Sequence, residues 1–524
     1  MSAGRSEERP QLRTDGPADR PAGWARIGRE LARAWRLAPV RRGFYGSLAI
    51  TIGSLTPAYL PQSSILWQPL RAAHLDGPAV KLIGTVVVLA GMWGLVDGWF
   101  RLRRVGSEMA AGWAILAVWS LPFLFAPPIF SHDAYSYAAQ GWMLHNQVNP
   151  YEAGPSVLPG AFADQVAWVW RYTPAPYGPL SLQLSHLLVD LSGFEPTVAT
   201  WLMRLPALAG VALIVTGLPR IARRVGADVG RVTWYACINP LLVIDFVGGS
   251  HNDALMMGLA VSALWLACRG RWWWLLGAVL VGLAAAIKQP AFLAAYVVPL
   301  LSRPLTTWRD PRQVLVAVGR SLLALVLAAA TFVLVSLACR LGFGWIQALG
   351  VPGSVVTVSP STVIGQGLQL LIDPNGHDWV RLVRGLVQTA GFASVAVFAV
   401  WLAPRQPIRA LSASWLTVAF TAPALHSWYV LWGGLLLPLS SAGQRWMARL
   451  TVPVTVVLLS YAAINLAWRN GVWAIGVAAG ALLLWWAYLH ERAVRRRRSV
   501  GSDETAGSDE TAGSDGPAGS ASER

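Results

Sequence analysis

The chain has 524 residues, of which 55% are hydrophobic and only 13% are charged. Apolar runs of about seventeen to twenty-five residues recur along it, and each is long enough to cross a bilayer. The composition therefore excludes an ordinary soluble protein and predicts an all-α, polytopic membrane protein. The net charge of +16 comes almost wholly from arginine, since Lys81 and Lys288 are the only lysines. The arginines gather in the tails and in short loops between apolar runs, which favours a role in membrane orientation over nucleic-acid binding.

Residues 1–43 are predicted to form a basic cytoplasmic tail rather than a cleaved signal peptide. Residues 1–42 contain ten Arg and five acidic residues, with scattered Pro and Gly. The stretch WARIGRELARAWRL separates an apolar face from an arginine face, which predicts a helix lying on an anionic leaflet. The apolar face consists of Trp24, Ile27, Leu31 and Trp35.

About fourteen transmembrane helices are expected within residues 44–490. Residues 180–193 are also apolar, but a crossing there would turn the RIARR cluster at 220–224 outward, so we expect a helix on the outer surface. Both termini should then face the cytoplasm. Most loops that carry arginine would lie on that same side of the membrane, and the exceptions are Arg340, Arg381, Arg384 and Arg469. The expected spans lie near 44–62, 78–99, 109–130, 197–218, 231–247, 252–268, 272–287, 289–302, 314–338, 381–402, 409–425, 428–442, 449–467 and 472–489.

The C-terminus repeats the six-residue pattern GSDETA after HERAVRRRR. Such a segment has too little apolar content to fold. Residues 491–524 are therefore predicted to be a disordered cytoplasmic tail.

A long outer loop is expected at 131–196, opening with SHDAYSYAAQGWMLHNQVNPYEAGP. Ser131 can cap a short helix that carries His132 and Asp133 in its first turn. Tyr137 and Gln140 would follow on the same face as Asp133. A carboxylate placed where an apolar segment has just ended is costly unless it is paired or functional. The alternative is a simple helix cap at the membrane edge.

Arg171 lies in the same loop, within VWRYTPAPYGPL. The prolines limit the conformations of this stretch, and its aromatic residues, including Tyr177, surround one guanidinium. This arrangement suits a phosphate or a sugar ring. The alternative is an arginine that reaches toward lipid headgroups.

The sequence GGSHNDALMMG joins two expected spans through a tight turn. His251, Asn252 and Asp253 form a polar tip, with Asp253 placed to begin the next helix. A plain N-cap explains the aspartate. It does not explain the histidine or the asparagine, so this tip is a second candidate site.

Lys288 and His426 are two further candidates. Lys288 ends an apolar run, and Pro290 interrupts the helix just beyond it. A single lysine beside a helix break favours an anion site or a transport pathway, although lysine can also extend to the interface. His426 lies between two spans, where an aromatic belt explains the neighbouring Trp and Tyr but not the histidine. A second outer loop is expected at 340–380.

These motifs together resemble a known family. The strings SHDAYSYAAQG, NPYEAGP, TPAPYGPL and GGSHNDALMMGLA look like signatures of actinobacterial polyprenol-phosphate-mannose-dependent α-1,6-mannosyltransferases of the MptB type, in the GT-C superfamily. The resemblance covers about residues 44–490. It implies a plasma-membrane enzyme that takes mannose from polyprenyl-phosphate-mannose on the outer face. The implied acceptor is a lipid-anchored mannan, as in lipomannan synthesis, and the implied reaction inverts the donor linkage with Asp133 as the catalytic residue.

The same residues suggest how the donor is held. Arg171 and Lys288 are the best candidates to neutralise its phosphate, with His251 and His426 as additional donors. Many GT-C enzymes carry paired acidic residues where this chain has His132 and a single Asp133, so no metal and no other cofactor is expected. The competing class is a lipid or glycolipid transporter or flippase. A transporter should have internal repeats and polar residues near the bilayer midplane, whereas here the charged residues gather on one face.

Overall fold

The computed structural model describes residues 23–103, 111–348, 350, 359–372, 378–440 and 444–511. Within these residues the regular elements are all helices, with no strand. The predicted all-α fold of a polytopic membrane protein is therefore confirmed.

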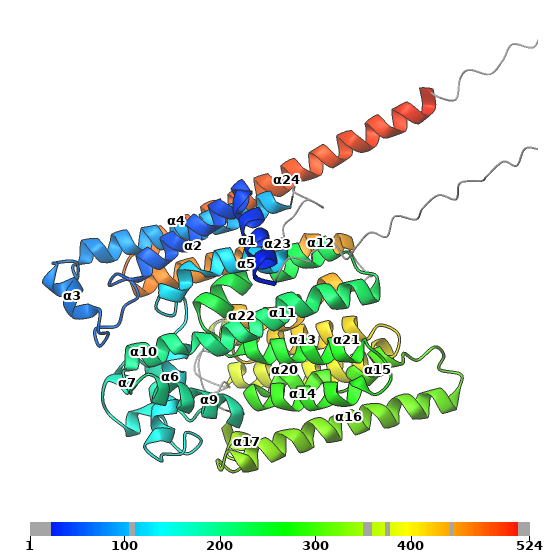
Figure 1. Ribbon diagram of the computed structural model, residues 1–524, viewed down its shortest axis with the longest axis horizontal. Coiled ribbons are helices and arrows are strands. Elements are labelled where there is room, and N and C mark those ends of the chain that lie inside the picture. Colours follow the sequence, from blue (N-terminus) through cyan, green and yellow to red (C-terminus); the bar gives the residue numbers. More distant parts are fainter. Residues whose placement is uncertain are drawn as a thin grey trace, which may run out of the picture.

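One group of helices forms the upper part of Figure 1. Helix α2 (Ala38–Ser54) packs along α4 (Pro78–Leu102), and α23 (Gln444–Arg469) packs along α24 (Trp473–Thr511). Helix α1 (Gly23–Arg36) contacts α2 and α5 (Gly112–Ser120), and the short α3 (Trp67–Ala72) joins α2 to α4. The N-terminal and C-terminal parts of the chain thus lie side by side.

A second group forms the larger body below it (Figure 1). Helices α11, α13, α14 and α16 pack against one another in chain order, and α20, α21 and α22 lie beside them. The expected span at 231–247 is instead two π-helical segments, Thr233–Cys237 and Leu242–Gly248. The other bounds are α11 (Arg204–Val225), α13 (Asp253–Ala267), α14 (Trp273–Ile287), α15 (Val298–Ser302), α16 (Pro311–Ala338), α20 (Trp379–Val397), α21 (Pro407–Thr421) and α22 (Ser427–Gly434).

The predicted first outer loop folds into a compact helical unit, the outer-loop unit, at the left of Figure 1. Its apolar core includes Tyr137, Leu182 and Val189, and it also takes in Leu341 and Ala348 from the predicted second outer loop. The two predicted outer loops therefore pack together. The unit contains α6 (Asp133–His145), α7 (Ala161–Asp164), α8 (Trp168–Arg171), α9 (Pro179–Leu191) and α10 (Pro196–Leu202), and the second loop adds α17 (Trp345–Ala348). The next helix of the second loop, α19 (Pro360–Ile372), packs against α20 and α21 instead.

Six helical stretches among the described residues are long and apolar enough to span a membrane, and five shorter apolar stretches accompany them. Helix α9 belongs to neither set. The count of fourteen and the surface position of α9 remain predictions. The six long stretches are Pro78–Leu102, Pro196–Val225, Pro311–Ala338, Trp379–Leu402, Leu450–Arg469 and Trp473–Ala493.

The two predicted tails are only partly described. Helix α1 occupies the stretch predicted to lie on the membrane surface, and Trp24 on it is 84% exposed. Residues 1–22 lie outside the described part. At the other end, α24 runs to Thr511 and overlaps the predicted disordered tail at 491–524, of which 512–524 lie outside the described part.

A close backbone approach joins the outer-loop unit to the membrane helices. The N–H of Gly178 donates to the carbonyl of Ile287 at 3.0 Å, where α9 begins and α14 ends. A Cβ at position 178 would lie 2.2 Å from the carbonyl oxygen of Ala286, so the approach requires glycine. This contact places Tyr177 beside Lys288.

Candidate active site

A cavity of about 1050 Å³ lies between the outer-loop unit and the membrane helices. Its wall combines a few polar side chains with many apolar ones, as in sites that bind amphiphilic ligands. Asp133 lines it together with residues from other segments that are distant in sequence. These include Tyr177, Lys288, Arg384, His426 and Trp432.

Asp133 is the first residue of α6. Its backbone N–H donates to the Ser131 hydroxyl at 3.1 Å, but the N-cap position is occupied by His132, so Ser131, the predicted cap, lies one residue before it. The Asp133 side chain is 14% exposed, and its Oδ2 lies 3.5 Å from Nδ1 of His251. The adjacent His132 points elsewhere, with Nε2 2.8 Å from a guanidinium nitrogen of Arg469. The helix therefore presents the aspartate, and not the neighbouring histidine, to the cavity.

The surroundings of Asp133 favour its ionised form. Burial by itself would raise the pKa of this carboxyl. The His251 contact and the positive charge of Lys288 oppose burial and lower the pKa to about 2. Asp133 is therefore a carboxylate at neutral pH, able to accept a proton.

Two histidines each stack on the same tryptophan, Trp428. The His251 ring lies 3.7 Å from that of Trp428, and Trp428 stacks on His426 at 4.4 Å with an interplanar angle of 8°. Neither ring nitrogen of the buried His251 has a hydrogen-bond partner among the described residues. Burial lowers the pKa of His426 to about 4, so this ring is neutral at pH 7. His426 lines the cavity, whereas His251 is not among the described lining residues and contacts the Asp133 carboxylate.

Lys288 and Asp253 form a buried ion pair. The Lys288 ammonium donates to both oxygens of Asp253, at 3.0 and 2.8 Å. The indole N–H of Trp432 donates to Asp253 at 2.7 Å, and the ring of Tyr429 lies 4.6 Å from the ammonium. The charge of Lys288 is therefore already balanced, and Asp253 is held as an acceptor for two donors.

A chain of polar contacts connects the remaining predicted residues. The Tyr137 hydroxyl donates to Oδ1 of Asn252 at 3.2 Å, and the Asn252 amide donates to Ser181 at 2.9 Å. Tyr137 also meets Tyr177 edge to face at 4.9 Å. These contacts tie α6, α9 and the start of α13 together. Gln140 is buried on α6, and its Oε1 has no partner among the described residues.

Arg171 lies apart from this group. Its guanidinium donates to the carbonyl of Asp164 at 2.9 Å and approaches the Asp164 carboxylate at 3.8 Å. The residue before it, Trp170, lines the cavity, whereas Arg171 is not among the described lining residues. Its predicted role as a phosphate ligand remains a prediction.

One face of α20 lines the opposite side of the cavity, and sequence reasoning did not assign it to the site. Arg381, Arg384, Gln388, Phe392 and Val395 all contribute to the wall. Their spacing of three or four residues marks a single helical face. The sequence did contain an indication of this role, because Arg381 and Arg384 were exceptions to the expected placement of arginines on the cytoplasmic side.

Comparison with known proteins gives the family. Residues 40–303 match the family described as alpha-(1→6)-mannopyranosyltransferase, N-terminal domain. Alpha-(1→6)-mannopyranosyltransferase A of Mycobacterium tuberculosis is 31% identical over 78% of this chain and 81% of its own length. This chain belongs to the α-(1→6)-mannopyranosyltransferase family. The probable enzyme of Mycolicibacterium smegmatis is also 31% identical, over 79% and 81% of the two chains. Alpha-(1→6)-mannopyranosyltransferase B of Corynebacterium glutamicum is 26% identical over 78% and 74%.

The region shared with the mannopyranosyltransferase family model contains the outer-loop unit and the polar tip. Asp133, Asn252, Asp253 and Lys288 all fall within it. His426 and the α20 face lie beyond residue 303. The cavity is therefore assembled from the matched part of the chain and from its C-terminal half.

Proposed function

We propose that this protein transfers mannose from polyprenyl-phosphate-mannose to a lipid-linked mannan, forming an α-1,6 linkage as in lipomannan synthesis. The observation that carries the proposal is the ionised Asp133 in the wall of a largely apolar cavity of about 1050 Å³, in a chain of the α-(1→6)-mannopyranosyltransferase family. We further propose a GT-C glycosyltransferase that acts at the extracytoplasmic face of the plasma membrane, with both termini in the cytoplasm.

The chemical step requires one base. The acceptor hydroxyl oxygen attacks the anomeric carbon of the mannose as its proton passes to the Asp133 carboxylate. The bond between that carbon and the phosphate oxygen breaks, and the electron pair leaves with the polyprenyl phosphate. Attack from the face opposite to the leaving group inverts a β-linked donor to an α-linked product, so no covalent sugar–enzyme intermediate is needed.

The leaving phosphate needs positive charge or hydrogen-bond donors nearby. Among the described lining residues, the cationic side chains are Lys288, Arg381 and Arg384. Lys288 is paired with Asp253, whereas Arg381 and Arg384 lie on one face of α20, with Arg381 87% exposed. We propose that the α20 face contacts the donor phosphate directly, while the Lys288–Asp253 pair supplies an ordered polar wall.

The lining also suits a lipid tail. Phe392 and Val395 continue the α20 face beyond its arginines, and Phe292 and Leu293 lie on the same cavity wall. A wall that combines arginines with apolar side chains matches a ligand with a charged head and a hydrocarbon chain. No cofactor or metal enters this proposed step.

The donor assay is the decisive experiment. Purified full-length protein in lipid vesicles, supplied with mannosyl polyprenyl phosphate and a short mannan acceptor, should extend the acceptor without GDP-mannose. The Asp133→Asn variant in the same vesicles controls for contaminating activity. A strict need for GDP-mannose would overturn the proposed donor. Movement of the lipid-linked sugar across the vesicle membrane without any product would instead indicate a flippase.

A further inference from the structure

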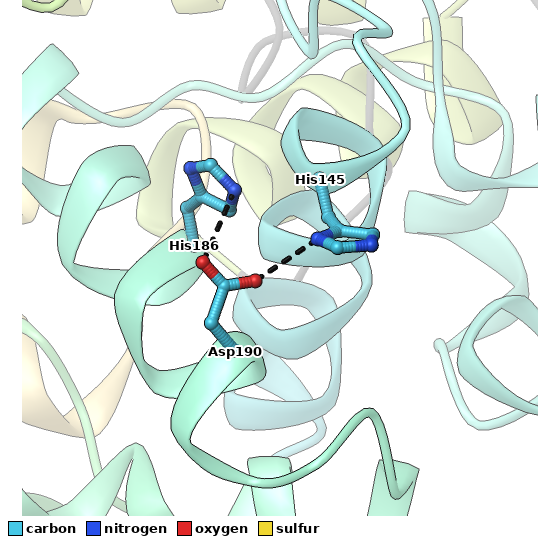
Figure 2. Close-up of side chains that lie close together, drawn as sticks. All are labelled: His145, His186 and Asp190. Carbon is cyan, nitrogen blue, oxygen red and sulfur yellow. Dashed lines mark hydrogen bonds and ion pairs between the residues drawn. The ribbon is translucent and has the colours of Figure 1, made fainter.

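Two histidines and an aspartate converge on the surface of the outer-loop unit (Figure 2). His145 is the last residue of α6, whereas His186 and Asp190 lie one turn apart on α9. Nδ1 of His145 is 3.0 Å from Oδ1 of Asp190, and Nε2 of His186 is 3.5 Å from Oδ2. Each residue offers one ligand atom, and the three atoms all lie within 4.8 Å of one another.

The packing of the two helices holds this group in place. At the crossing of α6 and α9, a Cβ on Gly141 would lie 2.4 Å from the carbonyl oxygen of Ser185, so the helices approach as closely as glycine allows. The His145 ring is stacked on Trp142 at 5.2 Å and lies 4.3 Å from Phe194. The His145 ring is therefore held by two aromatic neighbours, which reduces the entropy lost on binding an ion.

The separations suit a small divalent transition metal ion. Zinc binds imidazole nitrogen and carboxylate oxygen at about 2.0–2.2 Å in tetrahedral geometry, which places neighbouring ligand atoms roughly 3.3–3.6 Å apart. The distances of 3.0 and 3.5 Å, each to a different oxygen of Asp190, lie close to that range.

We propose that His145, His186 and Asp190 bind one Zn²⁺ ion. The three side chains are each about one-third to two-fifths exposed, so water can complete the coordination. Asp190 supplies negative charge to balance part of the ion, and the two neutral imidazoles supply the nitrogen ligands.

The ion has a structural role, separate from the transfer reaction. Helix α6 has 13 residues and begins at Asp133, so about 18 Å of helix separates Asp133 from His145. The metal would join the end of α6 to α9, and α9 in turn begins at the Gly178 contact with α14 beside Lys288. One ion thus fastens together two helices that position the cavity wall.

The test measures metal binding by the full-length protein purified in detergent without a polyhistidine tag. After chelation and dialysis, titration with Zn²⁺ should give one bound ion per chain and a higher thermal unfolding temperature. Co²⁺ in place of Zn²⁺ should give the visible absorption of a tetrahedral site. His145→Phe keeps an aromatic ring against Trp142, and Asp190→Asn keeps the shape of the carboxylate. Both variants should lose the bound ion and the temperature shift.

A matched control is available at His74, an exposed histidine outside the group with a φ of 58°. His74→Asn tolerates that backbone conformation and should bind Zn²⁺ as the wild type does. Equal binding by wild type, His145→Phe and Asp190→Asn would overturn the proposal. So would the absence of any bound ion in the folded wild type, which would leave Asp190 as a hydrogen-bond acceptor for two imidazoles.

Discussion

The Lys288 ammonium lies 2.8 Å from one oxygen of Asp253 and 3.0 Å from the other, in a buried pocket where Trp432 also donates to the same carboxylate. The pair joins the end of α14 to the first residue of α13. Removal of either partner leaves a buried charge without compensation. This relationship gives Lys288 and Asp253 a structural function in addition to any contact with substrate.

The first prediction separates these two functions. Lys288→Met alone should lower the stability of the protein by about 3–5 kcal/mol, because Asp253 is then buried without its partner. The double variant Lys288→Met with Asp253→Leu should recover much of that stability. Thermal unfolding in detergent and the mannosyl transfer rate are measured for both. Recovery of stability without recovery of transfer assigns the pair to the reaction site, whereas recovery of both would make it only structural.

The second prediction concerns the base. Asp133→Asn keeps the shape of the side chain and removes its basicity, so the transfer rate should fall by roughly two to four orders of magnitude. Expression, the thermal unfolding temperature and donor binding should stay near those of the wild type. A transfer rate close to that of the wild type would mean that Asp133 is not the base and only begins α6. Asp253 would be a poor replacement, because Lys288 and Trp432 already occupy its oxygens.

The third prediction links His251 to the ionisation of Asp133. The folded-state pKa of Asp133, about 2, lies below the value of about 3.9 for a solvated aspartate. The charged carboxylate therefore contributes stability above about pH 4, and this contribution is lost as the pH falls toward 2. His251→Phe preserves the ring stacked on Trp428 but removes the nitrogen that faces Asp133.

Burial then opposes ionisation with less compensation, so the pKa of Asp133 should rise in this variant. The ratio of variant to wild-type transfer rates should fall as the pH is lowered from 8 to 5. The ratio cancels the titration of groups that both proteins share. A ratio independent of pH would mean that His251 does not tune the base.

The fourth prediction compares the contributions of two arginines, Arg384 and Arg171, to binding of the donor phosphate. If Arg384 on α20 holds the donor phosphate, Arg384→Gln should raise the KM for the lipid-linked donor by about tenfold to a hundredfold, as expected for a lost hydrogen bond to a charged group. Arg171→Gln should change KM less, because the Arg171 guanidinium lies against Asp164 and not in the cavity wall. A larger increase in KM for Arg171→Gln than for Arg384→Gln would instead support Arg171 as the ligand of the donor phosphate.

The fifth prediction concerns topology. In a background without native cysteines, Val157→Cys in the outer-loop unit should react with an impermeant thiol reagent in intact cells. Arg309→Cys, in an exposed loop before α16, should react only after permeabilisation. The two sites are matched because both side chains are exposed. Labelling of position 309 in intact cells would require a different span count.

The sequence alone determined the class of protein and much of its local structure. Long apolar runs predicted a helical membrane protein because a bilayer demands backbone hydrogen bonds within each span. Ser131 and the polar residues after it predicted a helix with His132 and Asp133 in its first turn, and the helix begins one residue later, at Asp133. GGSHND predicted a helix that begins at Asp253, and it begins there. These features depend on neighbours within a few residues, which is why a linear pattern reveals them.

Only the tertiary structure decided which of these residues meet. Lys288 was predicted to face a phosphate, but its distance to Asp253 depends on how α14 packs on α13, and no periodicity encodes that. Arg171 and His132 carried the same local signals as true cavity residues, yet they contact Asp164 and Arg469. The arginines of α20 and the triad of His145, His186 and Asp190 arise from segments brought together by packing. Local propensity fixes where a helix begins, whereas contacts between distant helices fix what its side chains touch.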